Sequence, residues 1–149
     1  MRTVEVRLGM SVPPATVIRA FTDPDQLRGW WHVERTHIQL HYGGIYSLAW
    51  GISETGIRYV SAGIITTYDP EGILHIDKCM YYSPDRPFLG PLKLLVNATP
   101  VDNGCEVYLC QGPYPEQAGA DWDWYYDAVA DAWPKVLQDL KKFLEDQKG

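Results

Sequence analysis

The chain has 149 residues, the usual length of a single domain, and 46% of them are hydrophobic, which is enough for a buried core. Its formal net charge of −6 argues against a nucleic-acid partner and against docking on an anionic membrane, because both favour a basic face. No apolar run approaches the length of a membrane-spanning helix, and the first ten residues do not resemble a signal peptide. We therefore expect one domain over residues 1–149, with no nucleic-acid and no membrane partner.

The N-terminal part of the chain predicts a strand followed by two short helices. Apolar and polar residues alternate over Thr3–Met10, which is the pattern of a half-buried strand. A short helix then ends near Thr22. Asp23 is the expected N-cap of a second helix, because a proline comes directly after it and a glutamine three residues on. Gly29 is expected to end this second helix, directly before a pair of tryptophans.

The middle of the chain predicts an antiparallel meander. From Val33 the apolar pattern has a period of two, a glycine pair marks a turn at 43–44, and the alternation resumes through Trp50. Turn residues separate the later strands, including a connector with three prolines at Ser83–Pro91. Connectors this short require antiparallel neighbours. The later strands are expected at Arg58–Tyr68, Ile73–Tyr82, Leu92–Thr99 and Glu106–Gln111.

The C-terminal segment predicts a long amphipathic helix. One apolar stripe at three- and four-residue spacing consists of Trp122, Tyr126, Val129, Trp133, Val136, Leu137, Leu140 and Leu144. Pro134 lies within this stripe and lacks the N–H that would bond to the Ala130 carbonyl. Either one helix kinks there or a second helix begins with Asp131 as its N-cap. We favour the kink, because the stripe continues through Pro134 without a change of phase.

Six segments carry a resemblance to a known family. They are Val17–Pro24, the Trp30-Trp31 pair, Gly43–Leu48, Gly63–Leu74, Asp102–Val107 and Trp133–Leu144. In this order they resemble the homologues of the activator of heat-shock protein 90 ATPase, within the START-like (SRPBCC) superfamily. The resemblance implies an α+β helix-grip fold. In that fold a curved antiparallel sheet of about six to seven strands wraps around a long C-terminal helix, and two short helices follow the first strand.

The resemblance does not define an activity. The family and its relatives include chaperone cofactors, polyketide cyclases, lipid carriers and hormone receptors, so function has to be argued from the site. In a helix-grip fold, aromatic residues of the sheet and helices line a cavity between them, which is the chemistry of a small-molecule pocket. The alternative is that the same side chains fill this space. The predicted lining residues are Trp30, Trp31, Tyr46, Leu48, Trp50, Ile76, Lys78, Trp122, Tyr126 and Trp133.

Lys78 is the one charged residue in this predicted lining. It shares the strand parity of Leu74 and Ile76, and an ammonium group that points inward needs an anionic partner. Lys78 is therefore a candidate hook for a ligand carboxylate, or for an enolate in a cyclase-like reaction. The alternative is a strand end at which the ammonium group reaches water.

No metal, cofactor or catalytic motif is predicted. The four histidines lack a metal-ligand spacing, and no G-x-S-x-G, P-loop or G-x-G-x-x-G motif occurs. The three cysteines have an odd count and no CxxC spacing, which favours free thiols in the cytoplasm.

Three functions remain open. The leading hypothesis is binding of a small, mostly apolar molecule, aromatic or carboxylate-bearing, by a monomer or weak homodimer. The second is a cyclase, hydratase or isomerase that acts in the same cavity. The third is a chaperone-cofactor-like docking module that uses the acidic face of the last helix.

Overall fold

Seven antiparallel strands form one sheet, in the order β1-β7-β6-β5-β4-β3-β2. The computed structural model describes residues 1–148, except for the side chain of Lys148, so Gly149 of the predicted domain lies outside the described residues. The strands are β1 (Arg2–Met10), β2 (Arg35–Ile38), β3 (Ile45–Ser53), β4 (Gly56–Asp69), β5 (Ile73–Ser83), β6 (Arg86–Val101) and β7 (Gly104–Tyr114). The helices are α1 (Pro14–Thr22), α2 (Pro24–Trp31) and α3 (Ala120–Lys148).

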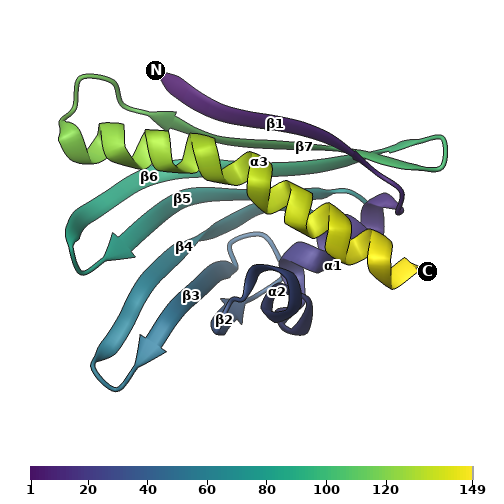
Figure 1. Cartoon of the computed structure of the whole chain (residues 1–149), viewed down its shortest axis with the longest axis horizontal. Helices are drawn as coiled ribbons and strands as arrows, with labels where there is room; N and C mark the ends of the chain where they lie inside the picture. Colours follow the sequence, from purple (N-terminus) through teal and green to yellow (C-terminus); the bar gives the residue numbers. More distant parts are fainter. Residues whose placement is uncertain (149) are drawn as a thin grey trace.

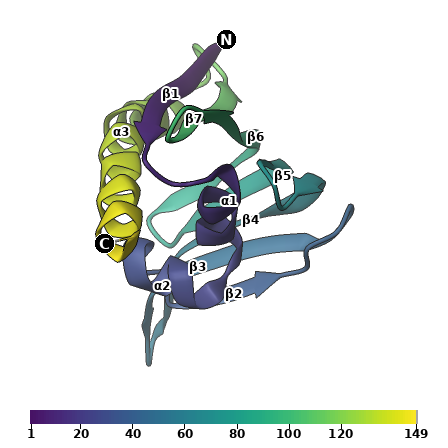
Figure 2. The same ribbon diagram turned by 90° about the vertical axis from the view of Figure 1, so that its right-hand side faces the viewer.

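The sheet curves, and the three helices lie on its concave side (Figures 1 and 2). Strands β2 to β7 follow one another as a meander, and the last strand returns to pair with β1. Helix α3 packs against β1, and it also contacts β6 and α2. The β3–β4 hairpin extends beyond α3 (Figure 1). This α+β architecture confirms the predicted fold class and the predicted meander.

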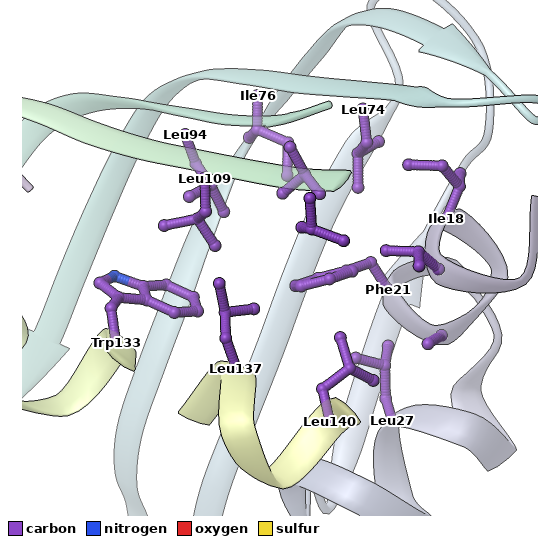
Figure 3. Packing of buried hydrophobic residues seen from close by; sticks show 14 of the residues in the cluster. Ile18, Phe21, Leu27, Leu74, Ile76, Leu94, Leu109, Trp133, Leu137 and Leu140 are labelled. Atoms are coloured by element: carbon purple, nitrogen blue, oxygen red, sulfur yellow. The ribbon is translucent and has the colours of Figure 1, made fainter. Parts of the chain in front are cut away.

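The core lies between α3 and the sheet, and Figure 3 shows its centre. Trp133 and Leu137 of α3 point toward Leu94 and Leu109 of the sheet. All four side chains are buried. Burial of one such side chain contributes about 1.5–3 kcal/mol to stability, so this layer fixes α3 on the sheet.

The junction of α1 and α2 is built as predicted, but α2 is longer than predicted. The Asp23 carboxylate accepts hydrogen bonds from the backbone N–H groups of Asp25 and Gln26, which confirms it as the N-cap. Helix α2 does not end at Gly29 and continues through Trp31. A Cβ atom at Gly29 would lie 3.0 Å from the Phe143 ring, so this glycine allows α3 to approach instead of ending the helix.

Helix α3 is one continuous helix with Pro134 inside it. Its axis changes direction along its length (Figure 1), so the predicted single, kinked helix is confirmed. Proline in a helix interior removes one backbone hydrogen bond and commonly bends the axis. Among the described residues, no helix has both the length and the apolar character needed to cross a membrane.

The predicted loop at Ser83–Pro91 is wrong. Strand β6 already begins at Arg86, so only two residues separate β5 from β6. The β5–β6 pairing is irregular there: Tyr81 pairs with Leu89 and Cys79 with Leu92, which leaves one extra residue on β6. Such a bulge tolerates prolines, because the ladder is already interrupted where their N–H is missing.

Candidate functional site

Half of the predicted cavity lining belongs to the packed core. Trp30, Tyr46 and Trp133 are 4–6% exposed, and Leu48 and Ile76 are also buried. The Tyr46 hydroxyl donates to the Phe21 carbonyl at 2.6 Å, and Trp30 Nε1 donates to the Ala20 carbonyl at 2.8 Å. Burial raises the pKa of Tyr46, so its hydroxyl stays protonated. These side chains fill the centre of the predicted chamber.

Trp31 and Trp50 connect this core to the surface. The Trp31 ring contacts the rings of Trp50 and Trp133, with centroids 5.1 and 5.4 Å apart. Trp50 Nε1 donates to the Trp31 carbonyl at 3.1 Å. Both residues remain partly exposed. They form one end of the group of rings described below.

Lys78 does not point inward, which corrects the predicted ligand hook. Its side chain is exposed, and its φ of 54° is in the left-handed region. The β5–β6 register shifts between Ile76 and Cys79, and Cys79 takes the buried position that the alternation assigned to Lys78. One extra residue in a strand reverses the faces of all residues after it.

Trp122 and Tyr126 are placed near the β1–β7 edge of the sheet. Both rings contact the buried Tyr114 ring, at centroid distances of 6.5 and 5.5 Å. The Arg2 guanidinium lies over the Tyr126 ring at 4.6 Å. The structure thus separates these two α3 residues from Trp31 and Trp50, with which the sequence had grouped them.

A different set of rings gathers on the concave face where β3 and β4 extend beyond α3. The set is Trp31, Trp50, Tyr59, Tyr81 and Trp124, here called the aromatic row. Trp50 and Tyr59 are paired across β3 and β4. Tyr59 and Tyr81 have ring centroids 6.3 Å apart, and Tyr81 and Trp124 6.5 Å. All five side chains are partly exposed, so the row offers apolar ring surface to solvent.

Three members of the aromatic row were not predicted. Tyr81 was missed because the bulge in β5 reverses the strand parity. Tyr59 had a signal in the sequence: a two-residue turn between Ser53 and Gly56 pairs Trp50 with Tyr59. Trp124 lies outside the predicted α3 stripe, and its position depends on how α3 sits over β5.

Two arginines border the aromatic row. Arg58 Nε donates to the Tyr59 hydroxyl at 2.8 Å. The Arg86 guanidinium lies 3.6 Å from the centroid of the Trp124 ring, and its Nη1 binds the Asp121 carboxylate at 3.0 Å. Positive charge and hydroxyl groups therefore lie beside a mostly apolar surface.

A buried amide supports the interior behind the row. Gln111 is 6% exposed. Its Oε1 accepts hydrogen bonds from the Tyr114 hydroxyl at 2.5 Å and from Trp133 Nε1 at 2.8 Å. Burial raises the pKa of Tyr114, so this hydroxyl remains a donor. The contacts join β7 to the middle of α3.

The acidic face of α3 is largely engaged in ion pairs within the molecule. Asp121 pairs with Arg86, and Asp123 with Arg2, each at 3.0 Å. Lys135 pairs with an acid one turn earlier, again at 3.0 Å. These pairs reduce the negative charge that the docking hypothesis requires.

Hollows of the described surface occur away from the predicted chamber. One of about 440 Å³ lies beside α1, with Leu40 and Tyr68 in its wall. None of the ten predicted lining residues borders it. This hollow therefore does not coincide with the predicted chamber.

Comparison with known proteins supports the fold and the family. The model of the family Activator of Hsp90 ATPase homolog 1-like protein matches residues 11–145, which confirms the resemblance found in the sequence. No protein among the curated sequences gives a significant match.

Solved structures share the architecture at low sequence identity. Protein MLL2253 from Mesorhizobium loti has 19% identity and a TM-score of 0.75, with 97% of this chain and 98% of that chain covered. The Aha1 dimer from Colwellia psychrerythraea has 18% identity and a TM-score of 0.72, with both chains fully covered. DynU16, from the dynemicin biosynthetic locus, has 16% identity and a TM-score of 0.69, with 96% of this chain and 47% of that chain covered. At these identities the likeness shows the fold alone.

Proposed function

The chain belongs to the family of Activator of Hsp90 ATPase homolog 1-like proteins, and we propose that it is a binding protein for a small, mostly apolar, aromatic molecule. The proposed site is the aromatic row on the open part of the concave face. The observation that carries this proposal is the series of five partly exposed rings, contributed by α2, β3, β4, β5 and α3. Folding brings them together from residues 31 to 124.

The chemistry of the row suits a planar apolar ligand. Aromatic pairs prefer offset or edge-to-face contacts at centroid distances of 4.5–7 Å, worth about 0.5–1.5 kcal/mol each beyond the buried area. Ring pairs within the row already lie at 5.1–6.5 Å. A ligand ring would extend this packing, while hydroxyl and indole groups would orient it.

The test uses N-phenyl-1-naphthylamine, an uncharged probe whose fluorescence rises in apolar surroundings. We expect saturable binding to the native protein. Replacement of one ring should weaken it about five- to tenfold, the loss of one aromatic contact and its buried area. Tyr81→Leu is the test variant and Tyr108→Leu the matched control. Tyr108 is equally a partly exposed tyrosine, but it lies on the other face of the sheet beside Arg7.

The two variants separate site binding from general surface binding. Circular dichroism first confirms that each variant is folded. A weaker response for Tyr81→Leu with an unchanged response for Tyr108→Leu supports the row. Equal responses in both variants, or no saturable binding to the native protein, would overturn the proposed function.

We also propose that the protein forms a homodimer through the convex face of the sheet, in the cytoplasm, where its three free cysteines would stay reduced. The three helices lie on the concave side (Figure 2), so they leave the convex face uncovered. Phe88 is 70% exposed there and packs on Tyr82, while Ile64 is 36% exposed. The similar Colwellia psychrerythraea protein is a dimer, which supports a second copy as the occupant of this face.

A further inference from the structure

We propose that the molecule bound on the aromatic row carries an anionic group, of which a carboxylate is the simplest, and that Arg58 and Arg86 hold this group. The inference rests on the proposed function and narrows its ligand class to aromatic acids. It replaces the predicted hook, because Lys78 is exposed at a bulge, and neither Arg58 nor Arg86 had been selected from the sequence.

Arg86 is held in place at one end of the row. Its guanidinium stacks on the Trp124 ring at 3.6 Å, and Asp121 holds its Nη1. Among the described residues, no hydrogen bond occupies Nε or Nη2 of Arg86. A guanidinium fork can bind a second acceptor through such free edges, and a stacked guanidinium loses less freedom when it does.

Arg58 supplies positive charge that forms no ion pair among the described residues. Its Nε donates to the Tyr59 hydroxyl. The hydrogen bond from Arg58 to Tyr59 raises the Arg58 pKa, and the charge of Asp85 raises it further. With Arg86 balanced by Asp121, Arg58 leaves positive charge beside the rings.

Both arginines act on the same point of the row. Arg58 donates to the Tyr59 hydroxyl, and Arg86 stacks on the Trp124 ring. The rings of Tyr59 and Trp124 both contact the Tyr81 ring, at centroid distances of 6.3 and 6.5 Å, so the two arginines flank Tyr81. A flat aromatic acid can therefore place its ring on the tyrosines while its carboxylate reaches a guanidinium.

The experiment compares two ligands that differ only in charge. Bound N-phenyl-1-naphthylamine is displaced with 1-naphthoate or with 1-naphthamide, which share one ring system. We expect 1-naphthoate to displace the probe at a concentration about five- to tenfold lower than 1-naphthamide. This ratio corresponds to the free energy of a charge-assisted hydrogen bond, reduced because the arginines are partly exposed. In the double variant Arg58→Gln/Arg86→Gln this preference should fall to about one.

Two further variants control for other roles of the arginines. Arg7→Gln removes an arginine that also stacks on a tyrosine and pairs with an acid, but on the convex face, and it should keep the preference. Asp121→Asn breaks the Arg86 ion pair and leaves the Arg86 charge, so the preference should persist or increase. If Asp121→Asn loses the preference, Arg86 only tethers α3 and its proposed role is overturned.

The outcome separates this inference from the proposed function. Equal displacement by 1-naphthoate and 1-naphthamide, with probe binding still sensitive to Tyr81→Leu, overturns the anionic ligand and leaves the aromatic row as a binding site. Probe binding that is insensitive to Tyr81→Leu overturns both.

Discussion

Gln111 shows how one buried polar residue fixes the contact between β7 and α3. Its side-chain oxygen accepts two hydrogen bonds, from Tyr114 and Trp133. In Gln111→Leu both donors stay buried without a partner, and each unsatisfied donor costs about 1–3 kcal/mol of stability. We expect urea unfolding to show a loss of about 2–4 kcal/mol.

Two comparisons test this explanation. Tyr114→Phe removes one of the two bonds and leaves Gln111 with the other, so its cost should be about 1 kcal/mol. Gln138→Leu, at an exposed position of α3, should change stability by no more than about 0.5 kcal/mol. A loss for Gln111→Leu as small as that for Gln138→Leu would contradict the structural role of the amide.

At the scale of elements, the two halves of α3 are anchored differently. Leu137, Leu140 and Leu144 in the second half are 0–2% exposed. Within residues 121–130 only Tyr125 is buried, while Trp122, Tyr126 and Val129 are partly buried against the core. Ion pairs to Arg2 and Arg86 add to these contacts. Exposed ion pairs contribute little, at about 0–1 kcal/mol each, so the first half should open more readily.

Amide hydrogen exchange measures this difference. We expect faster exchange over residues 121–130 than over 136–144, because local opening is cheaper where fewer apolar side chains are buried. Arg86→Gln should accelerate the first segment and leave the second unchanged. A bound aromatic acid should slow the first segment, since Trp124 belongs to the aromatic row. Uniform protection along the helix would show that α3 moves only as one unit.

Strands β3 and β5 show how far the site can be predicted from the sequence. In β3 the strict alternation placed Tyr46, Leu48 and Trp50 on the concave face, where they lie. In β5 the alternation failed after Ile76, because a bulge depends on the pairing with β6 and leaves no mark in the local pattern. The candidate site therefore changed from Lys78 to Tyr81 and its neighbours.

At the scale of the whole molecule, several buried hydroxyl and thiol groups make stability depend on pH. Burial raises the pKa of Tyr46, Tyr114 and Tyr125 above 10.0. The pKa of Cys79 is raised to about 12, mainly by burial and also by the negative charge of Asp77. A raised folded-state pKa gives stability that is fully present below the unfolded-state pKa and is lost as pH rises.

The expected loss falls on the alkaline side. The unfolded-state pKa values are 9.0 for cysteine and 10.0 for tyrosine. The free energy of unfolding should therefore be level below about pH 9 and then fall by up to about 1.4 kcal/mol per pH unit for each group. Urea unfolding at a series of pH values measures this slope. Tyr46→Phe removes one of the titrating groups, so the slope should become smaller by the contribution of that group. A level free energy through about pH 11 would contradict the burial of these hydroxyls.

The proposed dimer is also tested on the whole molecule. Sedimentation velocity should show a dimer that dissociates on dilution, and Phe88→Ser with Tyr82→Ser should shift it to monomer by removing exposed apolar area. Phe88 and Tyr82 lie on the convex face and outside the aromatic row, so probe binding should persist in this variant. A native monomer at all concentrations would refute the dimer.

The overall architecture was predictable because it follows from short connectors and from the period of apolar residues. The filled interior could not be predicted from the sequence. Whether Trp30, Trp133 and Tyr46 line a cavity or fill it depends on the distances between α2, α3 and β3, and the apolar pattern of the sequence does not determine these distances. Interiors pack to a high density, and here large aromatic side chains supply that volume.

The tryptophan contacts also affect how this protein absorbs polarised light. Trp30 and Trp31 are stacked at 5.2 Å, and Trp31 contacts Trp50 and Trp133. Indoles this close couple their electronic transitions, so the far-ultraviolet dichroism should contain a paired positive and negative band in addition to the peptide signal. Helix content calculated from that spectrum alone would then differ from the helices α1 to α3. Trp30 and Trp31 both belong to α2, whereas Trp50 and Trp133 come from β3 and α3. The part of the paired band that arises from Trp31 with Trp50 and Trp133 would therefore appear in a refolding experiment only once β3 and α3 have docked on α2.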